Sequence, residues 1–292
     1  MLSRNISAVV FALLAPGLFG QTPPVSALPE DSGYTMRRGR NIQPFYEGWQ
    51  KLPNGRTVMW FGYLNRNSEE ETDVPVGPNN KFDLRADMGQ PTHFYPRRRR
   101  FVFRVELPAD WPEDRRLVWT VTANGRPDSA NGWLQAEWEV DDGVIQMNLG
   151  LDTAPPDPPN FAPGISVKGD TAAVVGRVLT LAASATDDGL PKGRRPTNFQ
   201  VTPQKATPLP IPVTVAPRAV RGLRIRWMLY RAPETGGSVT FDRGSTEPAL
   251  GASAAELVTG ATFSAPGTYW LRAVASDGML ETPYDLKVNV VK

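Results

Sequence analysis

Short stretches in which apolar side chains occupy every second position place the strongest constraint on the fold. This alternation occurs in residues 101–107, in residues 117–123 and in residues 134–140, and it is the pattern of a strand with one face in a core. Asn124-Gly125 and Asp142-Gly143 follow two of these stretches, and such pairs favour tight turns between strands. The sequence therefore predicts an all-β fold.

The chain after the turn at Asp142-Gly143 is expected to form a further strand at residues 144–149, with no helix in the first half. In this arrangement Trp119 and Trp138 lie on the apolar faces of their strands, and both are predicted core residues. A β-sandwich is the simplest fold for such a series of short strands.

Prolines divide the chain into two halves. Five of the 29 prolines lie between residues 152 and 163, and proline-dense segments are stiff and cannot pair as central strands. We predict a Pro-rich linker at residues 151–165, between sandwich domains at residues 28–150 and 166–292. A second proline-rich segment, residues 202–217, is expected to loop out of its domain.

The first 27 residues have the pattern of an export signal. Arg4 precedes an apolar run at residues 6–18, and Val25-Ser26-Ala27 fits a cleavage site that requires small residues. The alternatives are a buried N-terminal strand or a membrane anchor, although the run is short for a membrane span. We expect a signal peptide at residues 1–27 and an exported protein (periplasmic, cell-surface or extracellular) with no transmembrane segment after cleavage.

Composition excludes several classes of function. Cysteine is absent and His93 is the only histidine, which excludes thiolate nucleophiles and cysteine–zinc sites. No serine in a G-x-S-x-G motif could partner His93, so we expect no enzyme of the catalytic-triad type. Lys and Arg total 32 against 30 Asp and Glu, a net charge of +2, and this balance disfavours a nucleic-acid partner.

The second half carries a family resemblance. Residues 179–191, Trp227 with residues 237–241, and residues 261–278 resemble, in order, the blocks of bacterial PKD-like domains (polycystic-kidney-disease-type, immunoglobulin-like). The resemblance implies an Ig-like sandwich that buries Trp227 between its sheets and acts as a spacer or adhesion module without catalysis. The first half resembles uncharacterised exported bacterial proteins in short blocks at residues 45–49, 61–67 and 89–94.

Aromatic residues in the first half suggest a ligand. Aromatic rings exposed on a sandwich can stack on sugar rings, and the predicted glycan-binding residues are Trp49, Phe61, Tyr63 and Trp133. The alternative, which large aromatic side chains generally favour, is that the strand at residues 58–64 is buried on both faces.

A run of four arginines at residues 97–100 is the strongest basic feature. Arg97 and Arg98 are predicted ligand contacts, because guanidinium groups bind anionic polymers well, and His93 in a polar loop is a further candidate. The alternative, which we favour slightly, is ion pairing within the chain to the acidic segment at residues 69–73.

Two aspartates on a turn and a third on a later turn suggest a cation. Asp187, Asp188 and Asp277 are candidate ligands for Ca²⁺, which prefers hard oxygen donors. Ordinary turn chemistry explains the same residues without a metal, and no other cofactor is expected.

Together these observations predict an exported, non-catalytic adhesion or carbohydrate-binding protein. Its first domain would recognise a polysaccharide or another cell-surface polymer, and its PKD-like domain would act as a spacer or contact other envelope proteins. One alternative is a structural envelope or matrix protein without a small ligand. The other is a secreted glycoside hydrolase that works through carboxylates in residues 41–150.

Overall fold

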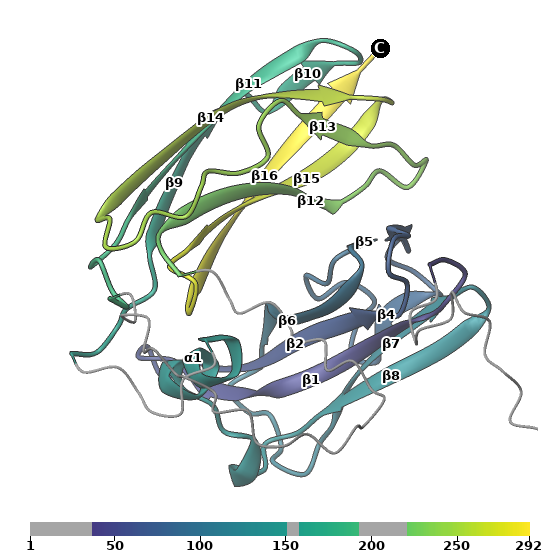
Figure 1. The fold of residues 1–292 in the computed structure, drawn as a ribbon. Helices are drawn as coiled ribbons and strands as arrows, with labels where there is room; N and C mark the ends of the chain where they lie inside the picture. Colours follow the sequence, from purple (N-terminus) through teal and green to yellow (C-terminus); the bar gives the residue numbers. More distant parts are fainter. Residues whose placement is uncertain (1–36, 151–157, 193–220) are drawn as a thin grey trace, which may run out of the picture. The chain divides into compact units, whose positions relative to one another are not determined.

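The computed structural model describes residues 37–150, 158–192 and 221–292 (Figure 1). The predicted signal peptide, residues 151–157 of the predicted linker and the proline-rich segment at 202–217 lie outside the described residues. The described residues all belong to one compact unit. Among them, no helix has the length and apolar character needed to cross a membrane.

The first sandwich is built from two three-stranded antiparallel sheets and one short strand pair. One sheet has the order β1-β2-β6 and the other the order β4-β7-β8, while β3 pairs with β5. Their bounds are β1 Ile42–Lys51, β2 Thr57–Asn65, β3 Thr72–Asp73, β4 Asn80–Phe82, β5 His93–Phe94, β6 Arg97–Glu106, β7 Leu117–Ala123 and β8 Arg126–Gly132.

The core of the first sandwich centres on Trp119, which is fully buried. Its ring packs edge-on against Phe103 at 5.0 Å and is stacked on Phe82 at 5.9 Å, and its Nε1 donates to Asn80 Oδ1 at 2.9 Å. Burying one large aromatic side chain stabilises a fold by roughly 2–3 kcal/mol. The alternation in residues 117–123 thus forms a half-buried strand, and the prediction that Trp119 is a core residue is confirmed.

The strand expected at residues 134–140 is wrong. This segment contains a 3₁₀ turn, η1, at Ala136–Trp138, and Trp138 is 40% exposed rather than in the core. The alternation fails because the segment lies beside the end of β1 instead of continuing a sheet: only Trp49 and Glu139 form an isolated bridge there.

The strand expected at residues 144–149 is also wrong, because a helix, α1, spans Asp142–Gly150. Asp141 explains its start: its side chain accepts a hydrogen bond from the Val144 amide at 2.8 Å, which satisfies one free N–H of the first turn. Ile145 then packs with Val140 and Leu280 in a small cluster of its own. The helix thus buries one apolar side chain, Ile145, and needs no neighbouring strand for its backbone hydrogen bonds.

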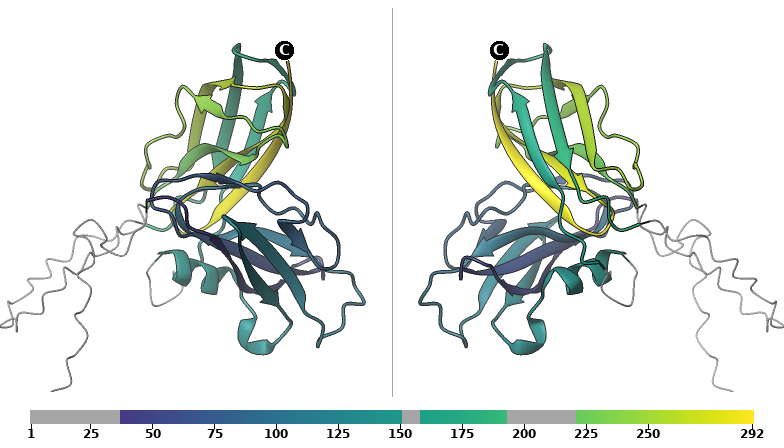
Figure 2. Two further views of the ribbon diagram at one scale, coloured as in Figure 1. Left: turned by 90° about the vertical axis from the view of Figure 1, so that its right-hand side faces the viewer. Right: turned by 90° about the vertical axis from the view of Figure 1, so that its left-hand side faces the viewer.

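The second sandwich consists of two four-stranded sheets, seen in two views in Figure 2. The orders are β13-β14-β11-β9 and β10-β16-β15-β12, with β10 parallel to β16. Their bounds are β9 Gly164–Gly169, β10 Ala172–Val174, β11 Val178–Thr186, β12 Arg224–Arg231, β13 Val239–Phe241, β14 Ala254–Phe263, β15 Gly267–Ser276 and β16 Glu281–Val291.

If β9 and β10 are counted as two parts of the first strand, this strand order is that of an immunoglobulin-type sandwich. There the second, fifth and fourth strands pair in one sheet and the third, sixth and seventh in the other. Trp227 is 5% exposed in the core between the sheets, as expected. The predicted all-β sandwich architecture is therefore confirmed, with α1 as the one α-helix of the described residues.

The edge of β12 is covered by two other segments. Residues 244–249 bridge its first half, where Leu223 pairs with Ala249 and Arg226 with Ser245. The loop before and after β5 covers its second half: Thr92 donates its amide to the Tyr230 carbonyl at 3.2 Å. Covering an edge strand in this way prevents it from pairing with another chain.

Candidate binding cleft

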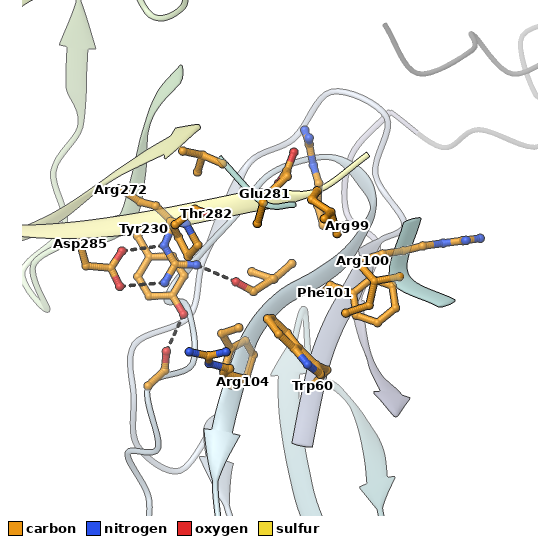
Figure 3. Close-up of a pocket in the computed structure, with 18 of the residues that line it drawn as sticks. Trp60, Arg99, Arg100, Phe101, Arg104, Tyr230, Arg272, Glu281, Thr282 and Asp285 are labelled. Carbon is orange, nitrogen blue, oxygen red and sulfur yellow. Dashed lines mark hydrogen bonds and ion pairs between the residues drawn. The ribbon is translucent and has the colours of Figure 1, made fainter. Parts of the chain in front are cut away.

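A cleft of about 780 Å³ is lined by β6 of the first sandwich and by β12, β15 and β16 of the second (Figure 3). A short stretch of β2 and the start of α1 add Trp60, Asp142 and Ile145 to its lining. Concave sites of this size with a few polar groups are the usual form of a ligand site.

An irregularity in β6 gives the cleft its character. Phe61 pairs with Phe103 and Tyr63 with Arg99, so a step of two residues on β2 is matched by a step of four on β6. Phe101 lies inside this bulge with a φ of +48°, a conformation that costs a non-glycine residue roughly 1–3 kcal/mol. As a result the consecutive residues 98–104 all line the cleft, whereas a regular strand would turn every second side chain away.

Gly62 of β2 makes room for this bulge. A Cβ atom at position 62 would overlap both the Arg99 carbonyl oxygen and Glu47 Oε1. The bulge therefore requires glycine at position 62. Bulges of this kind commonly redirect side chains toward a binding site.

Trp60 forms the aromatic part of the first wall. Its Nε1 donates to Gln50 Oε1 at 3.0 Å, and its ring meets Phe101 edge-on at 6.1 Å. The guanidinium of Arg104 lies over the ring at 5.5 Å from the centroid (Figure 3). The ring is half-buried, so one part is held by the protein and another part meets the cleft.

Arg272 anchors the opposite wall. It donates to both carboxylate oxygens of Asp285, at 2.6 Å and 2.8 Å, and to the Val102 carbonyl of β6 at 2.7 Å. Its guanidinium also lies 3.4 Å from the centroid of the Tyr230 ring. These contacts, drawn in Figure 3, hold the two walls together at this point.

The charge of the cleft is not balanced. Three of its arginines have carboxylate partners: Arg98 with Glu47, Arg226 with Glu281 and Arg272 with Asp285. The other three have no ion pair within the described residues, and all three are exposed; they are Arg99, Arg100 and Arg104.

The expected pairing of the arginine run with the acidic segment at residues 69–73 is wrong. Arg98 pairs with Glu47 instead, at 2.7 Å. The acidic segment has other partners: Glu69 pairs with Arg37, and Glu71 and Asp73 hold His93. Burial raises the pKa of Glu47, and the charge of Arg98 works against this effect.

Among the predicted ligand contacts, Arg97 and His93 lie outside the cleft lining. Arg97 is exposed at the start of β6. The His93 ring is 8% exposed, with Nδ1 2.8 Å from Asp73 Oδ1 and Nε2 3.0 Å from Glu71 Oε2. Both ring nitrogens are thus already occupied by neighbours in the fold.

Phe61 and Tyr63 are buried, at 0% and 2% exposure. Their rings pack against Phe103 and Phe94, respectively. The face of the strand that carries them is therefore buried, and although Tyr63 belongs to the cleft lining, neither ring is available as a flat surface for a sugar. The opposite face, which carries Trp60, is only partly buried.

Trp133 belongs to the segment at residues 133–140 and Trp49 lies against it, and neither residue lines the cleft. Trp49 Nε1 donates to the Gln135 carbonyl at 2.7 Å. Trp133 packs edge-on against Trp138 at 6.0 Å, and Arg116 lies over its ring at 4.5 Å. These tryptophans form a second aromatic group, which we call the η1 aromatic group: Trp49, Trp133 and Trp138.

The three candidate calcium ligands are occupied by the protein itself. Asp277 accepts hydrogen bonds from the amides of Met279 and Leu280 and from the side chain of Asn160. Asp187 and Asp188 each accept a hydrogen bond from the backbone amide two residues later in the chain. Burial, followed by the charges of Asp277 and Asp188, raises the pKa of Asp187 to about 6. Within the described ranges no group of three such side chains has the arrangement of a metal site, so calcium binding stays a prediction.

Six cleft residues that the proposals use were not among the predicted site residues: Trp60, Arg99, Arg100, Arg104, Arg226 and Arg272. Alternation in residues 223–229 does place Arg226 opposite the core side chains, which was the one available signal for that residue. Nothing in the sequence indicates that β6 and β12 share a cleft.

Neither a family model nor a curated protein matches the chain. Its structure has a similarity to the D00-D0 domain of Intimin, at 7% identity and a TM-score of 0.25, over 86% of this chain and 100% of that one. A second similarity is to a protein of unknown function from Porphyromonas gingivalis W83, at 11% identity and a TM-score of 0.22, over 85% and 98% of the two chains. Scores this low add nothing to the fold assignment, which depends on the strand order described above.

Proposed function

We propose that this chain is an exported, non-catalytic adhesion or carbohydrate-binding protein that holds part of a glycan in the cleft. The observation that carries this proposal is the combination, in one cleft of about 780 Å³, of the half-buried Trp60 ring with three exposed arginines that have no carboxylate partner among the described residues. The export signal predicted at residues 1–27 supports a glycan of the cell surface or its surroundings.

Trp60 has the features of a stacking platform for a sugar. The pyranose ring offers an apolar face that packs on an aromatic ring, and an indole provides the largest such surface. The hydrogen bond from Nε1 to Gln50 holds the ring in one orientation, so little rotational freedom is lost when a sugar binds. Arg99, Arg100 and Arg104 supply hydrogen-bond donors for hydroxyl or acidic groups around it.

The carboxylates of the cleft favour binding over hydrolysis. A glycoside hydrolase needs two free carboxyl groups on opposite sides of the scissile bond. In this cleft Glu281 and Asp285 are each held by an arginine, and Asp142 accepts a hydrogen bond from Gln50. The same carboxylates therefore stabilise the walls and are poorly placed to transfer protons.

The η1 aromatic group is a second candidate for the same function. Trp138 is 40% exposed and lies 6.0 Å from the Trp133 ring, and exposed tryptophans beside each other are suited to bind a sugar chain on an open surface. None of its three tryptophans lines the cleft described above, which is why we favour the site at Trp60.

Retention of the purified full chain on a panel of immobilised polysaccharides, neutral and acidic, tests both sites. We expect Trp60→Ala to weaken binding by about tenfold or more, because stacking on one aromatic ring contributes about 1–3 kcal/mol. Trp133→Ala is the matched control, and Trp60→Phe should retain part of the binding if the ring itself matters. Circular dichroism of each variant checks that it is folded.

Loss in Trp133→Ala alone would move the site to the η1 aromatic group. Equal binding by wild-type protein and both variants would contradict a stacking role for either tryptophan. The absence of retention on every polysaccharide would contradict the proposed function.

A further inference from the structure

Two arginines that line the cleft come from different sandwiches, and a third lies two residues from one of them on the same strand. Arg99 comes from β6, and Arg224 and Arg226 come from β12, where residues two apart point to the same side of the strand. Arg99 and Arg226 line the cleft itself. We call these three residues the arginine triad.

Arg224 and Arg226 point to the same side of β12, and Arg99 lines the same cleft as Arg226, so their charges affect one another. The pKa of Arg224 is lowered, first by burial and then by the positive charges of Arg226 and Arg99. Glu281 is the carboxylate that acts in the opposite direction, and it is already paired with Arg226 at 2.9 Å. Three positive charges thus share one negative charge.

Hydrogen bonding within the triad is also incomplete. Arg224 Nε is buried and has no acceptor among the described residues. Arg99 has no ion pair there, and its guanidinium lies 5.8 Å from the centroid of the Tyr95 ring. A buried donor without an acceptor destabilises a fold, and like charges add to that cost, so this arrangement is costly for the protein alone.

An oxyanion in the cleft would offset the excess positive charge at Arg99 and Arg226, which both line it. A sulfate or carboxylate group accepts hydrogen bonds from more than one guanidinium and offsets their charge. Because Trp60 lines the same cleft, a ligand that stacks a sugar on Trp60 can present an acidic substituent to the arginine triad. A neutral glycan would leave the triad as it is.

We propose that the ligand of the cleft is an acidic glycan, and that Arg99 and Arg226, with the charge of Arg224 beside them, form a subsite for one sulfate or carboxylate group of its chain. This inference rests on the proposed function and names the chemical class of its ligand. The bound anion joins β6 to β12 and therefore strengthens the contact between the two sandwiches.

Titration of the full chain with three kinds of oligosaccharide tests this inference: sulfated, uronic-acid-containing and neutral. We expect the two acidic kinds to bind and the neutral kind to bind at least tenfold more weakly. The affinity for the acidic kinds should fall between about 50 mM and about 300 mM NaCl, because salt screens exposed charges. Arg99→Gln should weaken acidic binding by about tenfold, the effect of one charge-assisted contact.

Arg97→Gln is the matched control, since Arg97 belongs to the same arginine run, is exposed and lies outside the cleft lining. It removes the same charge and should leave binding unchanged. An equal loss in the two variants would overturn the subsite, because it would reveal a general effect of net charge.

The remaining outcomes separate the subsite from the proposed function. Equal binding of neutral and acidic oligosaccharides would overturn the subsite and leave the proposed function standing, while no binding of any kind would overturn both. Inorganic sulfate that binds as tightly as the sulfated oligosaccharide, or duplex DNA that binds as tightly as either acidic kind, would overturn the assignment to a glycan.

Discussion

The two walls of the cleft differ in how many of their arginines are held by carboxylates. In the wall from the second sandwich, Arg226 and Arg272 each hold a carboxylate, and Arg272 is only 7% exposed. In the wall from the first sandwich, Arg98 is paired with Glu47, whereas Arg99, Arg100 and Arg104 are exposed and lack ion pairs among the described residues. The paired arginines contribute to the fold, and the proposed function depends on those that have no carboxylate partner. The partners of an arginine therefore distinguish the two kinds of wall.

Arg272→Ala, in the wall from the second sandwich, should have the largest effect on stability. We expect it to lower the free energy of unfolding by about 3 kcal/mol, because Asp285 loses its partner and the Val102 carbonyl loses its donor. Urea denaturation of the full chain measures this change. Arg99→Gln is the control from the other wall, and its effect should stay within about 0.5 kcal/mol. Similar losses in both variants would remove the distinction between the walls.

Gly62→Ala should have the next largest effect on stability, and it acts on the β6 bulge in the wall from the first sandwich. We expect a loss of about 2 kcal/mol in urea denaturation, because the new methyl group overlaps the Arg99 carbonyl and Glu47. Gly244→Ala is a suitable control: its Cβ would meet no atom within 4 Å and its backbone is not in the left-handed region. An unchanged stability for Gly62→Ala would indicate that the bulge can move without cost.

Asp87→Asn should have the smallest effect, at a contact between the two sandwiches outside the cleft lining. Arg231 donates to both oxygens of Asp87, at 2.7 Å and 2.9 Å, and this holds the pKa of Asp87 below its ordinary value. The ionised form is favoured in the folded protein, so the stabilisation is complete above about pH 4, the ordinary pKa of an aspartate. It is lost as the pH falls through the lowered value.

We therefore expect Asp87→Asn to lower the free energy of unfolding by about 1 kcal/mol at pH 7, since the Asp87 side chain is 55% exposed to solvent. The difference from the wild type should shrink as the pH falls below about 4. Urea denaturation at several pH values measures it, and a difference that does not depend on pH would contradict the role of the ion pair.

Much of the fold could be predicted from side-chain alternation. The pattern around Trp119 and that around Trp227 identify half-buried strands, because a period of two follows directly from strand geometry. The pattern around Trp138 misled, since alternation describes a strand only where a neighbouring strand is present to pair with it. Helix α1 escaped detection because its main signal is a single capping residue, Asp141.

The cleft could be predicted only in part. The arginine run was visible as a basic feature, but its partners were not, because Glu47 is distant in sequence and the nearby acidic residues pair elsewhere. The bulge at Phe101 was invisible because residues 101–107 alternate as regularly as a simple strand. Trp60 was interpreted as a core residue because its strand, residues 58–64, carries apolar side chains on both faces. Register and long-range pairing, which tertiary contacts decide, account for these errors.

The covered edge of β12 has a consequence for how this chain can be divided. Leu229 and Ala232 donate their amides to Tyr95 and Thr92 of the first sandwich, so the second sandwich produced alone would present these donors and the Tyr230 carbonyl to solvent. An uncovered strand edge invites pairing between copies. Expression of the whole chain is therefore the safer route to a monomer. Truncation at the Pro-rich linker, residues 151–165, would favour aggregation.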